Sequence, residues 1–227
     1  MIVRLIASTA FESSAATTAT GYKHHTYGVK EADELAELAG RVCYQSFTRP
    51  NPDTAENAGY LANILKQQHE SVLEHASATF YVAEVSRSLL AEITRHRHLS
   101  FSVMSQRFVD EGSATFITPP AIFKEQSEPI QLYLAATAGV RDFYDSIVKY
   151  LMKAGYTRKQ AREAARSVLP NAVETKFVVT GNMRAWRDVL KKRISTAADA
   201  EMQLFAREIF KILKEIAPNT FQDFDAI

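Results

Sequence analysis

Cysteine is nearly absent from this sequence, which contains a single thiol, Cys43, in 227 residues. One thiol excludes an internal disulfide framework and any zinc or iron–sulfur site built from several thiolates of one chain. This scarcity fits a reduced, cytoplasmic setting. The spacing of apolar residues places Cys43 on a helix stripe, so we expect it to pack in the core and to be a poor nucleophile.

An excess of either charge is also lacking, because 27 Lys and Arg residues balance 26 Asp and Glu residues for a net charge of +1. The chain has no general positive field for a nucleic acid, so any recognition of an anion must be local. No apolar run is long enough to span a bilayer, and the start MIVRLIAST lacks the pattern of a signal peptide. We expect a cytoplasmic protein that binds neither nucleic acid nor a membrane.

Apolar periodicity, in contrast, is plentiful. Hydrophobic residues make up 46% of the chain, enough for the core of one domain over residues 1–227. Alternation and short apolar runs predict strands at 1–8, 77–83 and 173–179, and an extended segment at 99–109. Helical spacing predicts helices at 32–47, 54–68 with Thr54 as N-cap, 85–93, 128–154, 158–168, after the N-cap Asn182, and at 200–216. Residues 11–31 are predicted to be a loop. The fold class predicted is α/β (α+β), a single mixed domain with a central sheet flanked by helices.

Two groups of residues are assigned to structure rather than to chemistry. Trp186 and the Phe/Met stripe of residues 200–216 are expected to form core or subunit contacts instead of a cofactor box. His69 and His75, with two glutamates between them, do not share one helix face, so no metal site is predicted there.

The densest cluster of polar groups is the run RHRHLSFSVMSQR, residues 95–107, at the end of a predicted helix. Its three arginines, two histidines and three serines can present guanidinium forks, hydroxyls and backbone N–H groups to a phosphorylated ligand. The alternative is a solvated helix end, where basic residues favour the negative end of the helix dipole.

The order within this run, Arg-His-Arg, two residues, Ser, four residues, Ser, one residue, Arg, resembles the signature of the flavin-dependent thymidylate synthases, the ThyX family. Further segments that resemble the family are HESVLEH at 69–75, ARSVLP at 165–170, and NMRA at 182–185 followed by Arg193. The resemblance covers about residues 35–224.

The resemblance implies a ThyX-like subunit of a homotetramer whose active sites are shared between subunits. It implies reductive methylation of dUMP to dTMP, with 5,10-methylenetetrahydrofolate as carbon donor and FAD, reduced by NADPH, as hydride source, without a cysteine nucleophile. The residues that match FAD-binding positions are Ser71, Arg95, His96, Arg97, Asn182, Arg184 and Asp188.

The same resemblance marks a set of dUMP-binding positions. They are Glu92, Arg95, Val103, Met104, Ser105, Gln106, Arg107, Arg166 and Arg193. Arg193 matches the arginine that faces the uracil ring, where a fixed cation favours negative charge on the pyrimidine, and it is the predicted catalytic residue.

Three positions depart from the family pattern: Val103 replaces an expected Glu or Gln, Phe108 an expected Tyr, and Asp188 an expected Asn or His. Val103 cannot offer a side-chain hydrogen bond, and Asp188 would repel a flavin diphosphate unless Arg187, Lys191 or Lys192 compensated for it. Two alternatives therefore stay open. One is a flavin-binding homologue with weak or lost methyl transfer, and the other is a nucleic-acid-binding module that stacks bases on aromatic residues.

Overall fold

The centre of the molecule is an antiparallel sheet. The structure, a computed structural model, describes residues 1–25, 28–49, 51–125 and 127–224. Within those ranges it has four strands in the order β1-β2-β4-β3. Their bounds are β1 Ile2–Ser8, β2 Ser77–Ser86, β4 Glu174–Asn182 and β3 Ser100–Val103. The predicted mixed α/β fold with a central sheet is confirmed.

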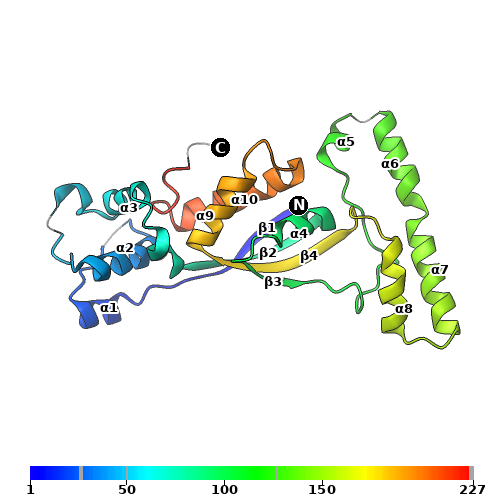
Figure 1. Ribbon diagram of the computed structural model, residues 1–227, viewed down its shortest axis with the longest axis horizontal. Coiled ribbons are helices and arrows are strands. Elements are labelled where there is room, and N and C mark those ends of the chain that lie inside the picture. Colours follow the sequence, from blue (N-terminus) through cyan, green and yellow to red (C-terminus); the bar gives the residue numbers. More distant parts are fainter. Residues whose placement is uncertain (26–27, 50, 126, 225–227) are drawn as a thin grey trace.

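The helices form three groups (Figure 1). The first group comprises α1 Ser13–Thr20, α2 Glu31–Tyr44, the 3-10 segment η1 Pro52–Thr54, α3 Asn57–Lys66 and the 3-10 segment η2 Glu70–Glu74. The second comprises α4 Arg87–Ile93, α9 Met183–Arg193 and α10 Ala200–Ile216. The third comprises α5 Pro120–Glu125, α6 Glu128–Ala138, α7 Val140–Lys153, α8 Arg158–Ala165 and the 3-10 segment η3 Arg166–Val168. Figure 1 shows the first and third groups at opposite ends of the sheet.

The core lies between the sheet and the helices α9 and α10. Phe80 of β2 and Val179 of β4 are fully buried, as the alternation in both strands predicts. Trp186 is also fully buried, and its indole N–H donates to the carbonyl of Ala78 at 3.2 Å while its ring meets Phe80 edge to face. The α10 stripe buries Met202, Phe205, Ile209 and Leu213. The assignment of Trp186 and this stripe to the core is confirmed.

Four element predictions need correction. The extended segment predicted at 99–109 is a strand only over β3, and residues 106–108 form a turn. Residues 11–31 are not entirely a loop, because α1 forms there. The hydroxyls of Thr18 and Thr20 donate to the backbone carbonyls four residues earlier. The N-cap of α3 is Glu56 rather than Thr54, because the Pro-rich turn before it closes as η1 with Asn51 as its cap. The single helix predicted at 128–154 is two, α6 and α7, which meet at Gly139.

The orientation of α2 is the largest difference from the sequence prediction. Its apolar stripe was expected inward, yet Cys43 is exposed and Val42 is 44% exposed. The buried face instead carries charge, including Asp33, Glu37 and Arg41. The prediction that Cys43 packs in the core is therefore wrong.

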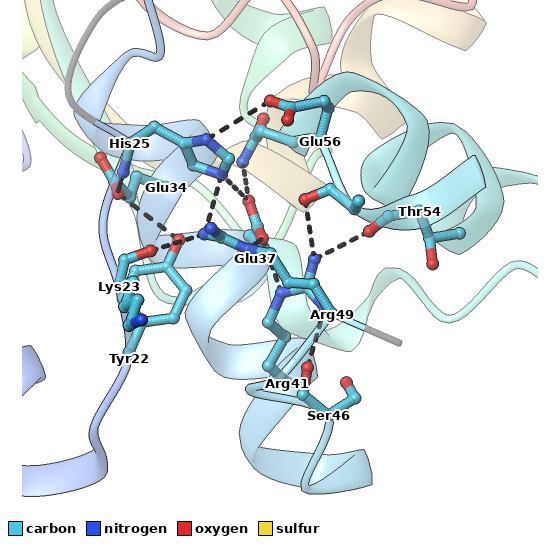
Figure 2. A network of polar contacts seen from close by, with 12 residues as sticks. Tyr22, Lys23, His25, Glu34, Glu37, Arg41, Ser46, Arg49, Thr54 and Glu56 are labelled. Carbon is cyan, nitrogen blue, oxygen red and sulfur yellow. Dashed lines mark hydrogen bonds and ion pairs between the residues drawn. The ribbon is translucent and has the colours of Figure 1, made fainter. Parts of the chain in front are cut away.

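A network of hydrogen bonds makes this buried charge tolerable (Figure 2). Glu37 is fully buried and accepts from Arg41 Nε at 2.6 Å and from Asn57 Nδ2 at 2.8 Å, and it lies 2.8 Å from His25 Nε2. Arg41 also donates to the carbonyls of Ser46 and Thr54. Burial alone would raise the pKa of Glu37, but the bonds from Arg41 and Asn57 hold it below its usual value.

Two further sets of hydrogen bonds hold residues 219–223 against α2 and α9. Asp33 accepts from the backbone N–H groups of Asn219 and Thr220, both at 2.8 Å. Arg187 of α9 turns away from solvent and donates to both oxygens of Asp223 at 2.6 Å. In the described ranges, none of the helices is both long and apolar enough to cross a lipid bilayer.

Candidate functional site

The helices that border the candidate site both begin with a side-chain cap. Ser86 accepts from the N–H of Leu89 at 3.1 Å and starts α4, and Asn182 accepts from the N–H of Ala185 at 2.8 Å and starts α9. The chain leaves α4 at Ile93, turns through residues 94–99 and enters β3 at Ser100. The polar run thus lies at a junction between a helix and an extended segment, as predicted.

Two adjoining cavities open where this junction faces α9. The first, of about 500 Å³, is lined by Arg95, His96, Arg97, His98, Leu99, Ala185, Asp188, Lys192 and Arg193. The second, of about 440 Å³, is lined by Glu74, His98, Asn182, Arg184, Ala185 and Asp188. Because they share His98, Ala185 and Asp188, we refer to both together as the α9 cleft.

A chain of polar contacts runs along one wall of the α9 cleft. Arg193 Nη1 donates to Glu92 Oε2 at 2.9 Å, and Arg193 Nε donates to His96 Nε2 at 2.9 Å. The other ring nitrogen of His96, Nδ1, lies 3.3 Å from Asp188 Oδ2. Asp188 in turn pairs with Lys192 at 2.6 Å. The arginine predicted to be catalytic is thus held from two sides, by α4 and by the turn after it.

The titration of these groups follows from their surroundings. Burial and the neighbouring Arg193 guanidinium hold the pKa of His96 below its ordinary value. Burial and the carboxylate of Asp199 raise the pKa of Glu92, against the effect of Arg193. For Asp188, burial would raise the pKa, but Lys192 and His96 lower it overall. His96 is therefore favoured as a neutral ring.

Six of the seven residues predicted to bind the cofactor line the α9 cleft. Arg95, His96 and Arg97 line its first cavity, Asn182 and Arg184 its second, and Asp188 both. Ser71 is the exception, because it is exposed on η2 and lines neither cavity. Its neighbour Glu74 does reach the cleft and forms an ion pair with Arg184.

The compensation expected for Asp188 comes from one lysine. Lys192 forms the ion pair described above, whereas Lys191 pairs with Glu70 at 2.9 Å and Arg187 is buried against Asp223. The spacing of four residues on one helix is what lets Lys192 reach Asp188.

The residues predicted to bind the nucleotide fall into two groups within this chain. Glu92, Arg95 and Arg193 lie at the α9 cleft. The others are Val103, Met104, Ser105, Gln106, Arg107 and Arg166. Among the described residues, no hydrogen bond or ion pair joins this second group to the first, although Arg87 of α4 donates to the carbonyl of Met104 at 3.0 Å.

Five residues of the second group lie in and directly after β3, and Arg166 lies on η3. Val103 is paired with Phe177 in the sheet, and Met104 lines a separate cavity of about 210 Å³. Ser105 begins a turn in which its carbonyl accepts from the N–H of Val109 at 2.9 Å. Gln106 is buried, and its side-chain Nε2 has no partner among the described residues. Arg107 and Arg166 are exposed, with their guanidinium groups available to a ligand.

The predicted site residues leave out Leu99, Ala185 and Lys192 of the cleft lining, together with two further polar residues. These two are His98 and Glu74. His98 belongs to the same basic run, which is a usable signal, whereas Glu74 reaches the cleft only because η2 packs beside α9. In the described ranges, no group of three or more His, Cys, Asp or Glu side chains could hold a metal ion.

Comparison with known proteins relates this site to a family. Residues 24–219 match the family model described as thymidylate synthase complementing protein, Thy1. The chain is 53% identical over 201 residues to a probable flavin-dependent thymidylate synthase of Mycobacterium phage L5, covering 87% of this chain and 82% of the relative. It is 51% identical over 227 residues to the protein of the same description from Mycobacterium phage D29, covering 98% and 96%. A flavin-dependent thymidylate synthase of Mycobacteroides abscessus is 48% identical over 198 residues, covering 84% and 79%.

Proposed function

This chain belongs to the family of the flavin-dependent thymidylate synthases, and on that premise we propose that it converts dUMP to dTMP at the α9 cleft. It is an enzyme, a methyltransferase of dTMP synthesis, and its cofactor is FAD. The carbon donor is 5,10-methylenetetrahydrofolate and the reductant is NADPH. The observation that carries the proposal is the cationic cleft in which Arg193 is held by Glu92 and His96.

The donor set of the cleft fits FAD. Arg95, Arg97 and Arg184 are exposed around the two cavities and provide guanidinium donors for a diphosphate. Asn182 uses its oxygen to cap α9, so its amide N–H₂ remains available as a donor. Ser71, on the neighbouring η2, completes the proposed set. When bound, FAD supplies the hydride that completes the methyl group.

Arg193 is the proposed catalytic residue. Its Nε donates one N–H to His96, and its Nη1 and Nη2 each donate one N–H to Glu92. A guanidinium has five N–H donors in all. Two N–H groups remain for a ligand, on a side chain whose orientation is already set. Such a fixed cation would stabilise negative charge on the uracil ring as its C5 becomes nucleophilic.

The phosphate of dUMP is assigned to the second group of residues. Ser105, Gln106, Arg107 and Arg166 combine a hydroxyl, an unpartnered buried amide and two exposed guanidiniums, with backbone N–H groups nearby. Val103 would contribute through its backbone, and Met104, whose N–H already donates to the carbonyl of Lys176 at 3.0 Å, would contribute by position. Because this group is separate from Arg193 within one subunit, we propose that each site combines residues of two subunits.

We propose that the chain self-associates as a homotetramer, which would allow sites shared between subunits. The helices α6 and α7 lie at one end of the molecule (Figure 1), and α6 has no buried residue while α7 buries Tyr144 alone. Exposed apolar side chains on them include Leu132, Leu134, Phe143 and Tyr150. A surface of this kind is typical of subunit interfaces. We propose that residues 1–227 form one domain of such an assembly, in the cytoplasm.

The deciding experiment is an absorbance spectrum of the purified protein with FAD, followed by an assay of dTMP from dUMP, methylenetetrahydrofolate and NADPH. A flavin spectrum together with dTMP is the expected result. Flavin without dTMP would identify a flavin-binding homologue, and the departures at Val103 and Asp188 would be the first candidates for the cause of the lost methyl transfer. No bound flavin, with salt-dependent binding of single-stranded DNA, would contradict the proposal in favour of a nucleic-acid module.

A further inference from the structure

Both ring nitrogens of His96 are hydrogen-bonded, one to a group that can only donate and the other to a group that can only accept. A guanidinium has donors only, so the contact from Arg193 Nε requires a lone pair on His96 Nε2. A carboxylate has acceptors only, so the contact to Asp188 requires a proton on His96 Nδ1. Both contacts therefore demand the same species, the neutral ring protonated at Nδ1.

We infer that Asp188 is a positioning residue, which fixes His96 in its Nδ1–H form so that Nε2 holds Arg193 in its working orientation. The inference rests on the proposed function, because it concerns the residue assigned to catalysis there. It gives Asp188 a role in place of the flavin contact that its position in the family pattern implies.

The environment of the ring supports this role. His96 is 8% exposed, so its hydrogen bonds are made away from water, where their geometry matters most. The ion pair between Asp188 and Lys192 joins side chains that are 44% and 63% exposed and contributes little by itself. The bond to His96 is thus the contact through which Asp188 acts on the site.

Aspartate is also better suited to this task than the asparagine expected at position 188. An asparagine side chain can turn either its oxygen or its amide nitrogen toward His96 Nδ1, so it permits both tautomers. Aspartate can only accept, so it permits one. The departure at Asp188 specifies the tautomer that Arg193 requires.

Protonation of His96 would break the arrangement. A proton on Nε2 would face the N–H of Arg193, which lies 2.9 Å away, and the hydrogen bond would be replaced by repulsion. The charged groups around the ring are Arg193, Lys192 and Asp188 of α9 and Arg95 and Arg97 of its own turn. The cations outnumber the carboxylate, so they too favour the neutral ring.

The tautomer can be measured without turnover by long-range ¹⁵N–¹H NMR of the histidine side chains of the full chain, as purified, at a pH of about 8. The chain has six histidines, so a His96→Gln variant assigns the signal. Wild type should show His96 protonated at Nδ1. Asp188→Ala should show loss of that state or a mixture of tautomers, and Asp188→Asn an intermediate result.

A matched control is Glu208→Gln, which removes a carboxylate from another exposed helical ion pair, that with Lys211. It should leave the His96 signal unchanged. His96 protonated at Nε2 in wild type, or the same Nδ1–H state in Asp188→Ala as in wild type, would overturn the inference.

Kinetics give the functional readout. Asp188→Ala should lower kcat about tenfold or more, as loss of a partner that orients a histidine does, while the KM for dUMP changes less and bound flavin is retained. Asp188→Asn should recover part of kcat. Loss of flavin with kcat per bound flavin unchanged would instead make Asp188 a cofactor ligand. The expected tautomer in a protein that forms no dTMP would contradict the proposed function and leave the His96 result standing.

Discussion

At the scale of single residues, Arg193 is the side chain on which the proposed chemistry depends. It is 18% exposed and is held by Glu92 at 2.9 Å on one side and His96 at 2.9 Å on the other. A cation that is oriented before the substrate arrives needs no reorganisation when charge develops. In the proposed mechanism Arg193 is an electrostatic catalyst and no thiol is needed, although Cys43 is exposed rather than buried.

Replacing Arg193 by Ala should lower kcat by about 100-fold or more, since removal of one preorganised donor has that effect in other enzymes. The flavin spectrum should be retained, because the other arginines of the α9 cleft remain. Arg207→Ala, at an exposed position of α10, is the control and should behave as wild type. An Arg193→Ala protein with normal kcat would remove Arg193 from the mechanism.

The lowered pKa of His96 predicts how stability depends on pH. The ordinary pKa of histidine is about 6.5, and the pKa of His96 in the folded protein lies below it. As pH falls below about 6.5, His96 therefore becomes protonated in the unfolded chain before it does so in the folded protein. The contribution of His96 to the free energy of unfolding is complete above a pH of about 6.5 and declines as pH falls toward the lowered pKa of the folded state. Urea unfolding of wild type and His96→Gln at several pH values should show the difference in free energy of unfolding shrinking on acidification. A difference that is constant with pH would contradict this.

At the scale of elements, α2 shows how a charged face can be the buried one. The carboxylate of Glu37 has polar partners in Arg41, Asn57 and His25, and Figure 2 shows its contacts with Arg41 and His25. Removing one member of such a network is costly because its partner remains as a buried, unpaired charge.

Glu37→Gln should therefore destabilise the protein by about 3–5 kcal/mol, because Arg41 is 1% exposed and would lose its carboxylate partner. The matched control is Glu56→Gln, which alters the rim of the same network at a side chain that is 84% exposed. It should cost less than about 1 kcal/mol. Equal unfolding midpoints in urea for the two variants would show that the buried network does not hold α2.

At the scale of the whole molecule, the separation of the two groups of residues proposed to bind the nucleotide matters most. Arg193 lies at the α9 cleft. Arg107 follows β3 and is not among the described residues that line the cleft. The apolar faces of α6 and α7 provide a surface through which a second copy could bring them together.

Two inactive variants should therefore complement each other. Arg107→Ala and Arg193→Ala proteins, mixed after mild dissociation and reassociation, should regain part of the wild-type activity, because some hybrid sites contain neither substitution. Sedimentation should give a mass of about four times the 25.4 kDa chain. A mixture as inactive as its components, with both variants assembled, would indicate that each site lies within one subunit.

The sequence by itself determined what depends on neighbours along the chain. The alternation of Phe80 and Val179, the Asn182 cap and the position of the basic run between a helix and a strand all follow from local spacing, and the structure has each of them. The family likewise follows from a local signature in residues 95–107.

Only the tertiary structure decided which charges meet. Glu37 is buried because Asn57 and His25 come to it from other segments, and this turned α2 so that Cys43 faces solvent. Arg193 and His96 are 97 residues apart in sequence yet share a hydrogen bond. Hydrophobic periodicity scores each residue alone, whereas the cost of burying a charge is set by partners that the fold brings from elsewhere.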